Sequence, residues 1–343
     1  MTARKYGYWI SDKDLTFWRN DPDTAWLGKG SVVAQQQTIR AFWASKGKKR
    51  YKSIKRDQPS LQYTARGFSL KQGTDGRVFL RLAGNIRVNV VWSRELPSAP
   101  SSVRVYRDTL GHWWVSFVAE RNDEHLPTTG RAIGIDWGIA DIATTTADTH
   151  DLPHPKHGRT AQAKLTKYQR MMARRKPKPG QKASRGYREA KRKTAQAHAK
   201  VRNQRADTAR KWATAVVRDH DQIAVEDFHP TFMFKNRSLA RAAADAAVGA
   251  TKRALIETAT RAGRKVVLVP PAHTTTDCSD CGARAKQRLE LSQRIYECWS
   301  CGLIMPRDKN SARLILAAAG FVRADADHVR PAARTHTARA RAV

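Results

Sequence analysis

The four cysteines of this chain constrain its fold more than any other feature. They all lie between Cys278 and Cys301, in two Cys-x2-Cys pairs separated by sixteen residues. Two such pairs supply four thiolates at the spacing of a zinc ribbon, and Gly282 and Gly302 permit a tight turn after each pair. Four protein ligands leave no open coordination position, so we predict one structural Zn²⁺, with four free thiols or disulfides as the competing interpretation. The predicted ligands are Cys278, Cys281, Cys298 and Cys301.

The charge of the chain points to a polyanionic partner. The 343 residues include 64 Lys and Arg against 30 Asp and Glu, a formal net charge of +34. A chain this basic repels itself unless a polyanion neutralises it, and nucleic acid is the usual one. No apolar run approaches the roughly 18–20 residues of a membrane span, and the first residues lack the apolar segment of a secretory signal. We therefore expect a cytoplasmic nucleic-acid-binding protein of about two domains, with no membrane partner.

The first third of the chain has a sequence pattern typical of a small β domain. A helical stretch over Val32–Ser45 comes first. Short segments rich in Val, Ile, Phe and Trp follow, separated by turn signals such as Gly84-Asn85, and they predict an antiparallel barrel or sheet. The expected strands are Val78–Leu82, Ile86–Trp92, Val103–Arg107 and His112–Ala119.

The remainder alternates buried-type strands with helices, which is typical of an α/β domain. The expected strands are Ala132–Gly138, Ile142–Thr146, Gln222–Val225 and Lys265–Val269. Residues 160–218 predict two long helices broken at Lys176-Pro177-Lys178-Pro179-Gly180, because apolar residues recur there in steps of three and four. Further helices are expected over Leu239–Gly263 and Asn310–Ala319.

Three acidic residues stand where an apolar strand ends or a helix begins. Asp136 follows Ile133-Gly134-Ile135, Glu226 follows Ile223-Ala224-Val225, and Asp308 starts the last helix. No single one of these acids identifies a site, and Asp136 alone also fits a turn or a helix cap. Three carboxylates from separate elements that converge can hold two Mg²⁺ ions about 3.5–4 Å apart for phosphodiester hydrolysis. In a chain built to bind nucleic acid, we predict such a site.

Several strings, in this order, resemble the TnpB family of transposon-encoded, RNA-guided DNA endonucleases, which are related to the small type V CRISPR effectors. They are Gly134-Ile135-Asp136-Trp137-Gly138, Val225-Glu226-Asp227-Phe228, the two cysteine pairs, and Arg307-Asp308-Lys309-Asn310-Ser311-Ala312. The likeness extends over roughly residues 40–320, and Lys46–Ser53 and Cys278–Gly282 also look like the family. The resemblance implies a guide RNA transcribed from the transposon end, a double-stranded DNA target, and a prokaryotic protein that is nucleoid-associated when bound to DNA.

The resemblance also implies a fold class, α/β plus β. An RNase H-like RuvC nuclease domain with an inserted zinc ribbon follows a wedge-type β-barrel that carries a partial helical insertion. The expected segments are a helical recognition segment at 1–50, the barrel at 51–128, the RuvC core with basic helices at 129–274, the ribbon at 275–304, the last RuvC segment at 305–322, and a disordered basic tail at 323–343.

The resemblance assigns roles to individual residues. Asp136, Glu226 and Asp308 stand where the family carries its three metal-binding acids, and Asn310 falls in its Asp-x-Asn motif. Arg294 stands where the family carries an arginine near the scissile phosphate, with Arg288 as a neighbouring alternative.

Residues 156–218 concentrate positive charge, with 21 Lys or Arg against two acids. Like charges along a helix repel one another, and a phosphate backbone is the natural counter-charge, as in a channel for a guide–target hybrid. A solvated basic helix pair is the alternative. The candidate contacts are Arg174, Arg175, Arg188, Lys191, Arg192 and Lys193. Aromatic residues of the barrel region could stack on bases, although such residues usually belong to a core.

The sequence departs from the family at its start. Residues 1–45 match only the later part of the helical insertion, so we expect guide binding but poor cutting of intact duplex. A start codon assigned too late and a naturally compact protein are the alternatives. For the whole chain we predict an RNA-guided DNA endonuclease. The other hypotheses are an RNA-guided repressor that binds without cutting and a plain zinc-ribbon nucleic-acid-binding protein.

Overall fold

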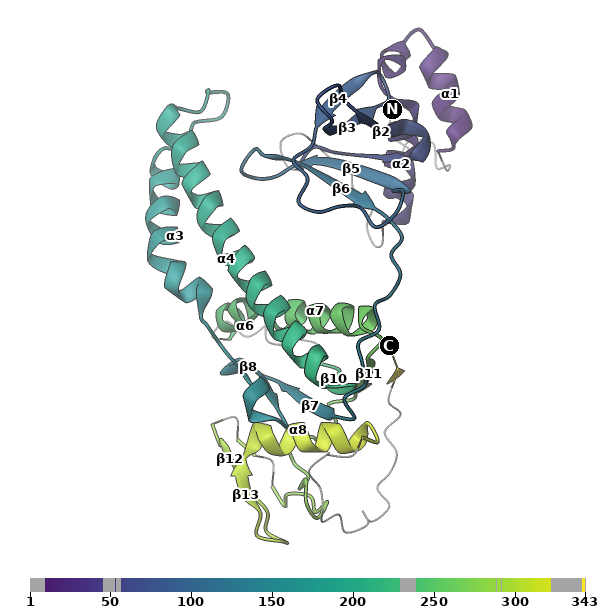
Figure 1. The fold of residues 1–343 in the computed structure, drawn as a ribbon. Helices are drawn as coiled ribbons and strands as arrows, with labels where there is room; N and C mark the ends of the chain where they lie inside the picture. Colours follow the sequence, from purple (N-terminus) through teal and green to yellow (C-terminus); the bar gives the residue numbers. More distant parts are fainter. Residues whose placement is uncertain are drawn as a thin grey trace. The chain divides into compact units, whose positions relative to one another are not determined.

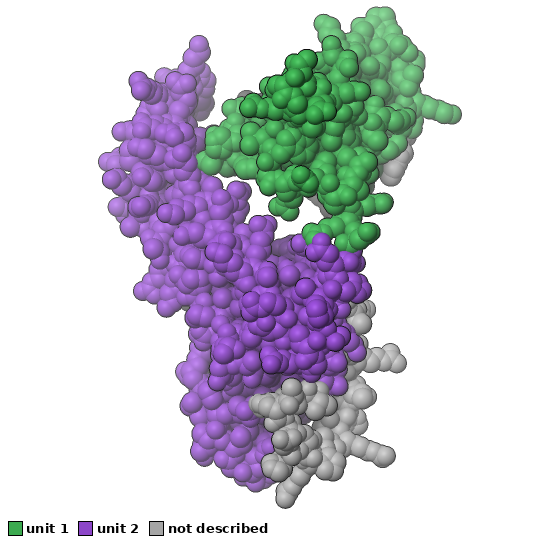
Figure 2. Space-filling model, in the orientation of Figure 1, with its two compact units in different colours: residues 1–122 green, residues 123–343 purple. Residues whose placement is uncertain are grey.

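The computed structural model describes residues 10–45, 53, 57–228, 239–287, 289–290, 292–321 and 341–342. Figure 1 shows the fold, and the chain divides into two compact units, residues 1–122 and 123–343 (Figure 2). Arg288 and most of the predicted basic tail fall outside the described residues. None of the described helices is long and apolar enough to cross a membrane.

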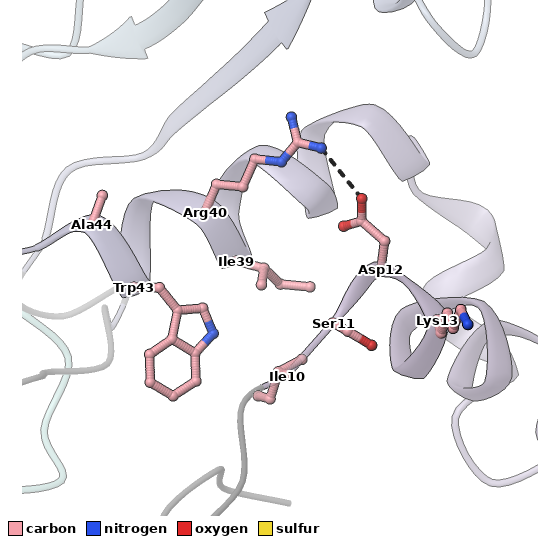
Figure 3. A pocket seen from close by; sticks show the side chains of 8 residues that line it. All are labelled: Ile10, Ser11, Asp12, Lys13, Ile39, Arg40, Trp43 and Ala44. Atoms are coloured by element: carbon pink, nitrogen blue, oxygen red, sulfur yellow. Dashed lines mark hydrogen bonds and ion pairs between the residues drawn. The ribbon is translucent and has the colours of Figure 1, made fainter.

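The first unit begins with two helices. The helix α1, Asp12–Asn20, starts at a capping box in which Ser11 and Asp14 satisfy each other's backbone N–H groups. A short 3-10 helix, Ala25–Lys29, leads to α2, Val32–Ala44, which matches the predicted helical stretch. The start of α1 and the end of α2 line an open hollow of about 630 Å³. Figure 3 shows the side chains that line it, among which Arg40 forms an ion pair with Asp12 at 3.3 Å.

Two three-stranded antiparallel sheets follow. One has the order β1-β5-β6 and the other β2-β3-β4, and no described ladder joins them into a closed barrel. Their inner faces share one core, which includes Tyr63, Leu80 and Val103. The strands are β1 Ser60–Thr64, β2 Phe68–Gln72, β3 Val78–Leu82, β4 Ile86–Asn89, β5 Ser102–Arg107 and β6 Trp113–Val118. All four predicted strands are present, and β1 and β2 add two that the sequence patterns did not reveal.

The second unit is built on a mixed sheet with the strand order β14-β11-β10-β7-β8-β9. The strands β7, β10 and β11 are parallel, and the others are antiparallel to their neighbours. Their bounds are β7 Ala132–Trp137, β8 Asp141–Thr145, β9 Leu152–Pro153, β10 Gln222–Glu226, β11 Lys265–Val269 and β14 Arg341–Ala342. The sheet therefore presents the carboxyl ends of three parallel strands at one edge.

Helices cover both faces of this sheet (Figure 1). The long helix α4, Arg185–Asp219, and α7, Val248–Arg261, pack on one face, where Ile133, Ile135 and Val225 are buried. The helix α8, Arg307–Ala318, packs on the other face. Side chains alternate along a strand, so the residues between these apolar ones point toward α8.

The predicted helix pair is present as α3, His157–Arg174, and α4. The face of α4 that the three-and-four pattern marks is buried or half-buried, as at Ala190, Val201 and Trp212. The remaining short elements are the 3-10 helices Ala65–Gly67 and Asp148–His150 and the strands β12 Ile295–Glu297 and β13 Ile304–Pro306.

Two expectations are wrong in detail. The single helix expected over Leu239–Gly263 is two helices, α6 Ala240–Ala246 and α7, because Ala247 is left-handed at φ 53°. The break lets the buried Asp245 accept hydrogen bonds from the N–H groups of Gly158 and Arg159 at the start of α3. In the predicted tail, Arg341–Ala342 pairs with β11, since an edge strand offers backbone groups to any sequence.

The close packing of β7 against α8 predicts a sensitive position at Gly134. A Cβ there would overlap the carbonyl oxygen of Ala312 and lie 2.8 Å from the Cβ of Leu316. Gly134→Ala should push α8 from the sheet, lower the free energy of unfolding by about 1–3 kcal/mol, and reduce the melting temperature in thermal unfolding. Gly249→Ala is the control, because a Cβ there meets open space in a helix. Equal melting temperatures for the two variants would contradict this packing.

Candidate metal centres and nucleic-acid interface

Asp136 and Glu226 lie on neighbouring strands near the same edge of the sheet. The parallel ladder aligns Val225 with Ile135, which places Glu226 and Asp136 next in register. Both residues fall on the face that α8 covers, because they alternate with the side chains buried under α4 and α7. Glu226 is 7% exposed and Asp136 is half-buried. The fold thus brings together two of the predicted acids, although ninety residues separate them in sequence.

The third acid, Asp308, lies in the first turn of α8, where the helix dipole favours a negative charge. Two arginines accompany it. The Nη1 atom of Arg294 is 3.8 Å from one carboxylate oxygen, and the Nε atom of Arg307 is 3.5 Å from the other. Arg294 is held there because its carbonyl accepts a hydrogen bond of 2.8 Å from the N–H of Arg307. The arginine singled out by the family resemblance therefore lies at the acid cluster.

The electrostatics show that the three acids are neighbours. Burial raises the pKa of Asp136 well above its usual range, and the negative charges of Glu226 and Asp308 raise it further, against the opposing charge of Arg307. Burial also raises the pKa of Glu226 to about 7, although Lys252 counteracts it. The cluster therefore carries negative charge that its surroundings do not fully compensate, and a bound cation would relieve it.

This charge and the oxygen ligands fit a hard divalent cation such as Mg²⁺. The fit is looser than at the cysteines. The sulfur atoms of the four cysteines all lie within 4.8 Å of one another. Among the described residues, the oxygen atoms of the three carboxylates do not come together this closely. Ligation of a single ion by all three acids requires their side chains to move closer together.

The raised pKa values predict that divalent cations bind this cluster more tightly as the pH rises. A carboxyl group must lose its proton to ligate a metal, and a pKa of about 7 at Glu226 leaves roughly one molecule in ten ionised at pH 6 and nine in ten at pH 8. Mn²⁺ binding, measured by electron paramagnetic resonance, should therefore strengthen about tenfold between pH 6 and pH 8. Equal affinity at the two values would contradict an uncompensated cluster.

The four cysteines meet as their spacing predicts. The Sγ atoms of Cys278 and Cys301 are 3.7 Å apart, and those of Cys281 and Cys298 are 3.6 Å apart. Tetrahedral Zn²⁺ with Zn–S bonds of about 2.3 Å requires sulfur–sulfur distances of about 3.8 Å, so these two distances fit zinc. All four sulfur atoms lie within 4.8 Å of one another. Gly282 and Gly302 adopt positive φ values of 75° and 74°.

The two halves of the ribbon repeat one turn. Cys278 N–H donates to the carbonyl of Ala283, and Cys298 N–H donates to that of Leu303. Asn310, the motif residue of α8, is fully buried and bonds to the backbone on either side of Cys278. Asn310 therefore belongs to the ribbon junction.

The candidate nucleic-acid residues lie at the end of α3 and at the start of α4. Arg174, Arg188, Lys191 and Arg192 are exposed. Two others have partners within the chain: Arg175 donates to the carbonyl of Gly186, and Lys193 forms an ion pair of 2.9 Å with Glu189. Arg188, Lys191 and Arg192 therefore present exposed positive charge along the first turns of α4.

Charge reversal on α4 should weaken RNA binding. Replacing Arg188, Lys191 and Arg192 with Glu removes phosphate partners, so each lost contact should flatten the slope of log affinity against log salt by about 0.7–0.9. The control reverses three exposed arginines of α6 and α7, namely Arg241, Arg253 and Arg261. If the slope is unchanged in the α4 variant, the basic helices are solvated and do not bind RNA. The same conclusion follows if the slope changes equally in the control variant.

Two basic residues at the acid cluster were missed by sequence reasoning. Arg307 is 8% exposed and opposes the raised pKa of Asp136, and Lys252 of α7 forms an ion pair of 2.7 Å with Asp227 beside Glu226. Arg307 adjoins Asp308 in the chain, which was a usable signal. Lys252 had none, because only the tertiary fold brings α7 to the end of β10.

Aromatic exposure in the first unit is confined to particular positions. Trp113 and Trp114 of β6 are 62% and 50% exposed, whereas Tyr63 of β1 is buried in the core. Phe17 and Trp26, in the segment before the sheets, are 69% and 65% exposed, so these four aromatic side chains are available to stack on a base.

Two family models match the chain. Residues 116–237 match the model OrfB_IS605, described as "Probable transposase", and residues 249–315 match "Cas12f1-like, TNB domain". A Streptomyces pristinaespiralis protein named "Putative RNA-guided DNA endonuclease" is 34% identical over 340 residues, covering 96% of this chain and 81% of that protein. The chain belongs to the TnpB family.

A second relative and a solved structure agree with this placement. The Escherichia coli K12 protein named "Putative RNA-guided DNA endonuclease InsQ" is 28% identical, covering 89% of this chain and 78% of its own length. A structure titled as a Cas12f1–sgRNA–target DNA complex matches 91% of this chain and 76% of its own, with a TM-score of 0.57 at 11% identity. That match shows a shared fold for this TnpB family member.

Proposed function

We propose that the chain is an RNA-guided DNA endonuclease of the TnpB type that hydrolyses phosphodiester bonds of target DNA at Asp136, Glu226 and Asp308. The observation that carries the site assignment is the convergence of these acids from β7, β10 and α8, with raised pKa values at Asp136 and Glu226. The mixed sheet with helices on both faces supports an RNase H-like RuvC core. Family membership and the names of the two relatives support the guided activity.

The acidic residues of the cluster supply negative charge, and the two arginines beside them partly compensate it. Asp136 and Glu226 present carboxylates from rigid strand ends, and Asp308 adds a third from the start of α8. Arg307 is buried and limits the repulsion among them. The side chain of Arg294 is 59% exposed and is free to contact a phosphate that reaches Asp308.

The acids are the residues that would hold Mg²⁺. Bound Mg²⁺ supplies charge neutralisation and an activated water for phosphodiester hydrolysis. The strand ends that carry Asp136 and Glu226 limit how far these two carboxylates must move to reach a bound ion, whereas Asp308 depends on the position of α8.

The cysteine ribbon would hold one structural Zn²⁺ through its four thiolates, which leave no position for substrate. The exposed basic side chains of α4 would contact the guide RNA or the guide–target hybrid through phosphates. A guide transcribed from the transposon end is the partner that the family likeness suggests.

Sequencing the RNA that co-purifies with the chain tests the guided part of this proposal. A single abundant RNA with a constant segment and a variable end is the expected result. RNA that samples the transcriptome without preference would point instead to a plain nucleic-acid-binding protein.

A further inference from the structure

The cysteine ribbon and α8 are joined at a buried amide. Asn310 is fully buried, and its Nδ2 atom donates to the carbonyl of Asp277 over 2.7 Å. Its Oδ1 atom accepts a hydrogen bond of 2.8 Å from the N–H of Ser279. These backbone groups flank Cys278, so one side chain of α8 spans the first cysteine of the ribbon. Both polar ends of the amide are occupied by these bonds.

A second joint lies one helical turn earlier. The N–H of Arg307 donates to the carbonyl of Arg294 over 2.8 Å, and its guanidinium donates to the carbonyl of Glu290 over 3.0 Å. These carbonyls precede the second cysteine pair, whereas Asn310 holds the first pair. Asp308 therefore lies between two residues that each attach α8 to a different half of the ribbon.

The start of α8 depends on these attachments. Its N-cap is Pro306, which offers no side-chain oxygen, and no side chain caps the first turn. The first N–H groups of a helix have no partners within the helix, so an uncapped start frays unless other contacts hold it. Here two sets of contacts hold the turn that carries Asp308: those of Arg307 and Asn310 to the ribbon, and those of Lys309 to the Thr145 carbonyl and to Asp148 and Asp151. Only the first set depends on the ribbon.

We propose that Asn310 is a positioning residue that couples the zinc ribbon to the acid cluster. Its two hydrogen bonds fix the first cysteine turn to α8, and the intact ribbon in turn fixes Asp308 beside Asp136 and Glu226. Loss of zinc or loss of this amide then has the same consequence, a displaced third carboxylate. The inference rests on the proposed function for its biological meaning, but the coupling itself is a property of the protein without nucleic acid.

The test compares Asn310→Ala with Ser311→Ala in full-length protein without RNA. Ser311 is also fully buried in α8, and its hydroxyl has no hydrogen-bond partner among the described residues, so it matches the loss of a buried polar group. The first measurement is the rate of zinc release to a chelator. The second is Mn²⁺ affinity by electron paramagnetic resonance, which reports the acid cluster without requiring cleavage.

Asn310→Ala should release zinc about tenfold faster and bind Mn²⁺ about three- to tenfold more weakly, because two hydrogen bonds are lost. Ser311→Ala should change neither value by more than about twofold. Zinc-stripped wild-type protein should show the same loss of Mn²⁺ affinity as Asn310→Ala, and stripping the variant should cause no further loss. Asn310→Asp should shift both values in the same direction, since it sets a carboxylate oxygen against the Asp277 carbonyl.

Unchanged Mn²⁺ affinity in Asn310→Ala would overturn the proposal, even if zinc release were faster. Equal effects of Asn310→Ala and Ser311→Ala would overturn it as well, because the cause would then be general packing of α8. If Asn310→Ala does not fold, Asn310→Asp and the zinc-stripped wild-type protein decide the matter by the same two measurements. A wild-type protein that binds Mn²⁺ as expected but cuts no guided target would refute the proposed function and leave the coupling intact.

Discussion

Asp136→Asn and Glu226→Gln should each reduce guided DNA cleavage by about 10³-fold or more and leave RNA binding within about twofold. The loss is large because each carboxylate contributes charge that holds Mg²⁺, and several kcal/mol of stabilisation of the transition state depend on it. RNA binding is spared because the exposed basic residues of α4 lie on a separate element. Cleavage rates and RNA affinities of the purified variants give the comparison.

The same substitutions should stabilise the protein when no divalent cation is present. The pKa of Glu226 is raised from 4.5 to about 7 on folding, so ionisation of this carboxyl group lowers the free energy of unfolding. The loss of stability grows as the pH rises from 4.5 to about 7 and is complete above that range. Glu226→Gln should therefore increase the free energy of unfolding at pH 8 by on the order of 1–3 kcal/mol. Asp141→Asn, at an exposed acid on β8, is the control and should change neither cleavage nor stability. A destabilised, active Glu226→Gln protein would show that Glu226 is a structural residue.

Replacement of Cys278 with Ser should remove the bound zinc and reduce cleavage by about 10- to 100-fold. The ribbon has only a small core around Tyr296, and the free energy of zinc binding is what folds such a segment. Without it, Asn310 and Arg307 lose their hydrogen-bond partners in the ribbon, and the contacts of Lys309 alone hold the first turn of α8. Elemental analysis should give about one zinc per wild-type chain and none in the variant.

Ser300→Ala tests whether this effect is specific to the ligands, because Ser300 is an exposed neighbour in the same turn. It should retain zinc and full activity. If reduced wild-type protein lacks zinc and still cuts at its normal rate, cleavage does not depend on zinc in the ribbon.

Local patterns were sufficient to predict the elements that carry the chemistry. The strand ends at Asp136 and Glu226 follow from apolar runs, and the cysteine ligands follow from spacing alone. The pairing of β7 with β10 did not follow from the sequence, because nothing local states which strand lies beside which. The resemblance to TnpB implied that the acids at these strand ends share one metal site, and it also pointed to Arg294.

The predictions that failed depended on tertiary contacts. The break falls at Ala247, two residues before Gly249, and it lets the buried Asp245 accept hydrogen bonds from the start of α3. The role of Asn310 was equally hidden, because its partners are backbone groups thirty residues away. Helix propensity and apolar periodicity carry no information about such long-range hydrogen bonds.

The most direct test of the guided nuclease is cleavage of a plasmid that carries a pre-opened target complementary to the co-purified RNA, because the chain is expected to cut intact duplex poorly. With Mg²⁺, the wild-type protein should cut this plasmid and spare one with a scrambled target, and Asp136→Asn should cut neither. Equal cutting of matched and scrambled plasmids, or cutting by Asp136→Asn at the wild-type rate, would contradict guided hydrolysis at this acid cluster.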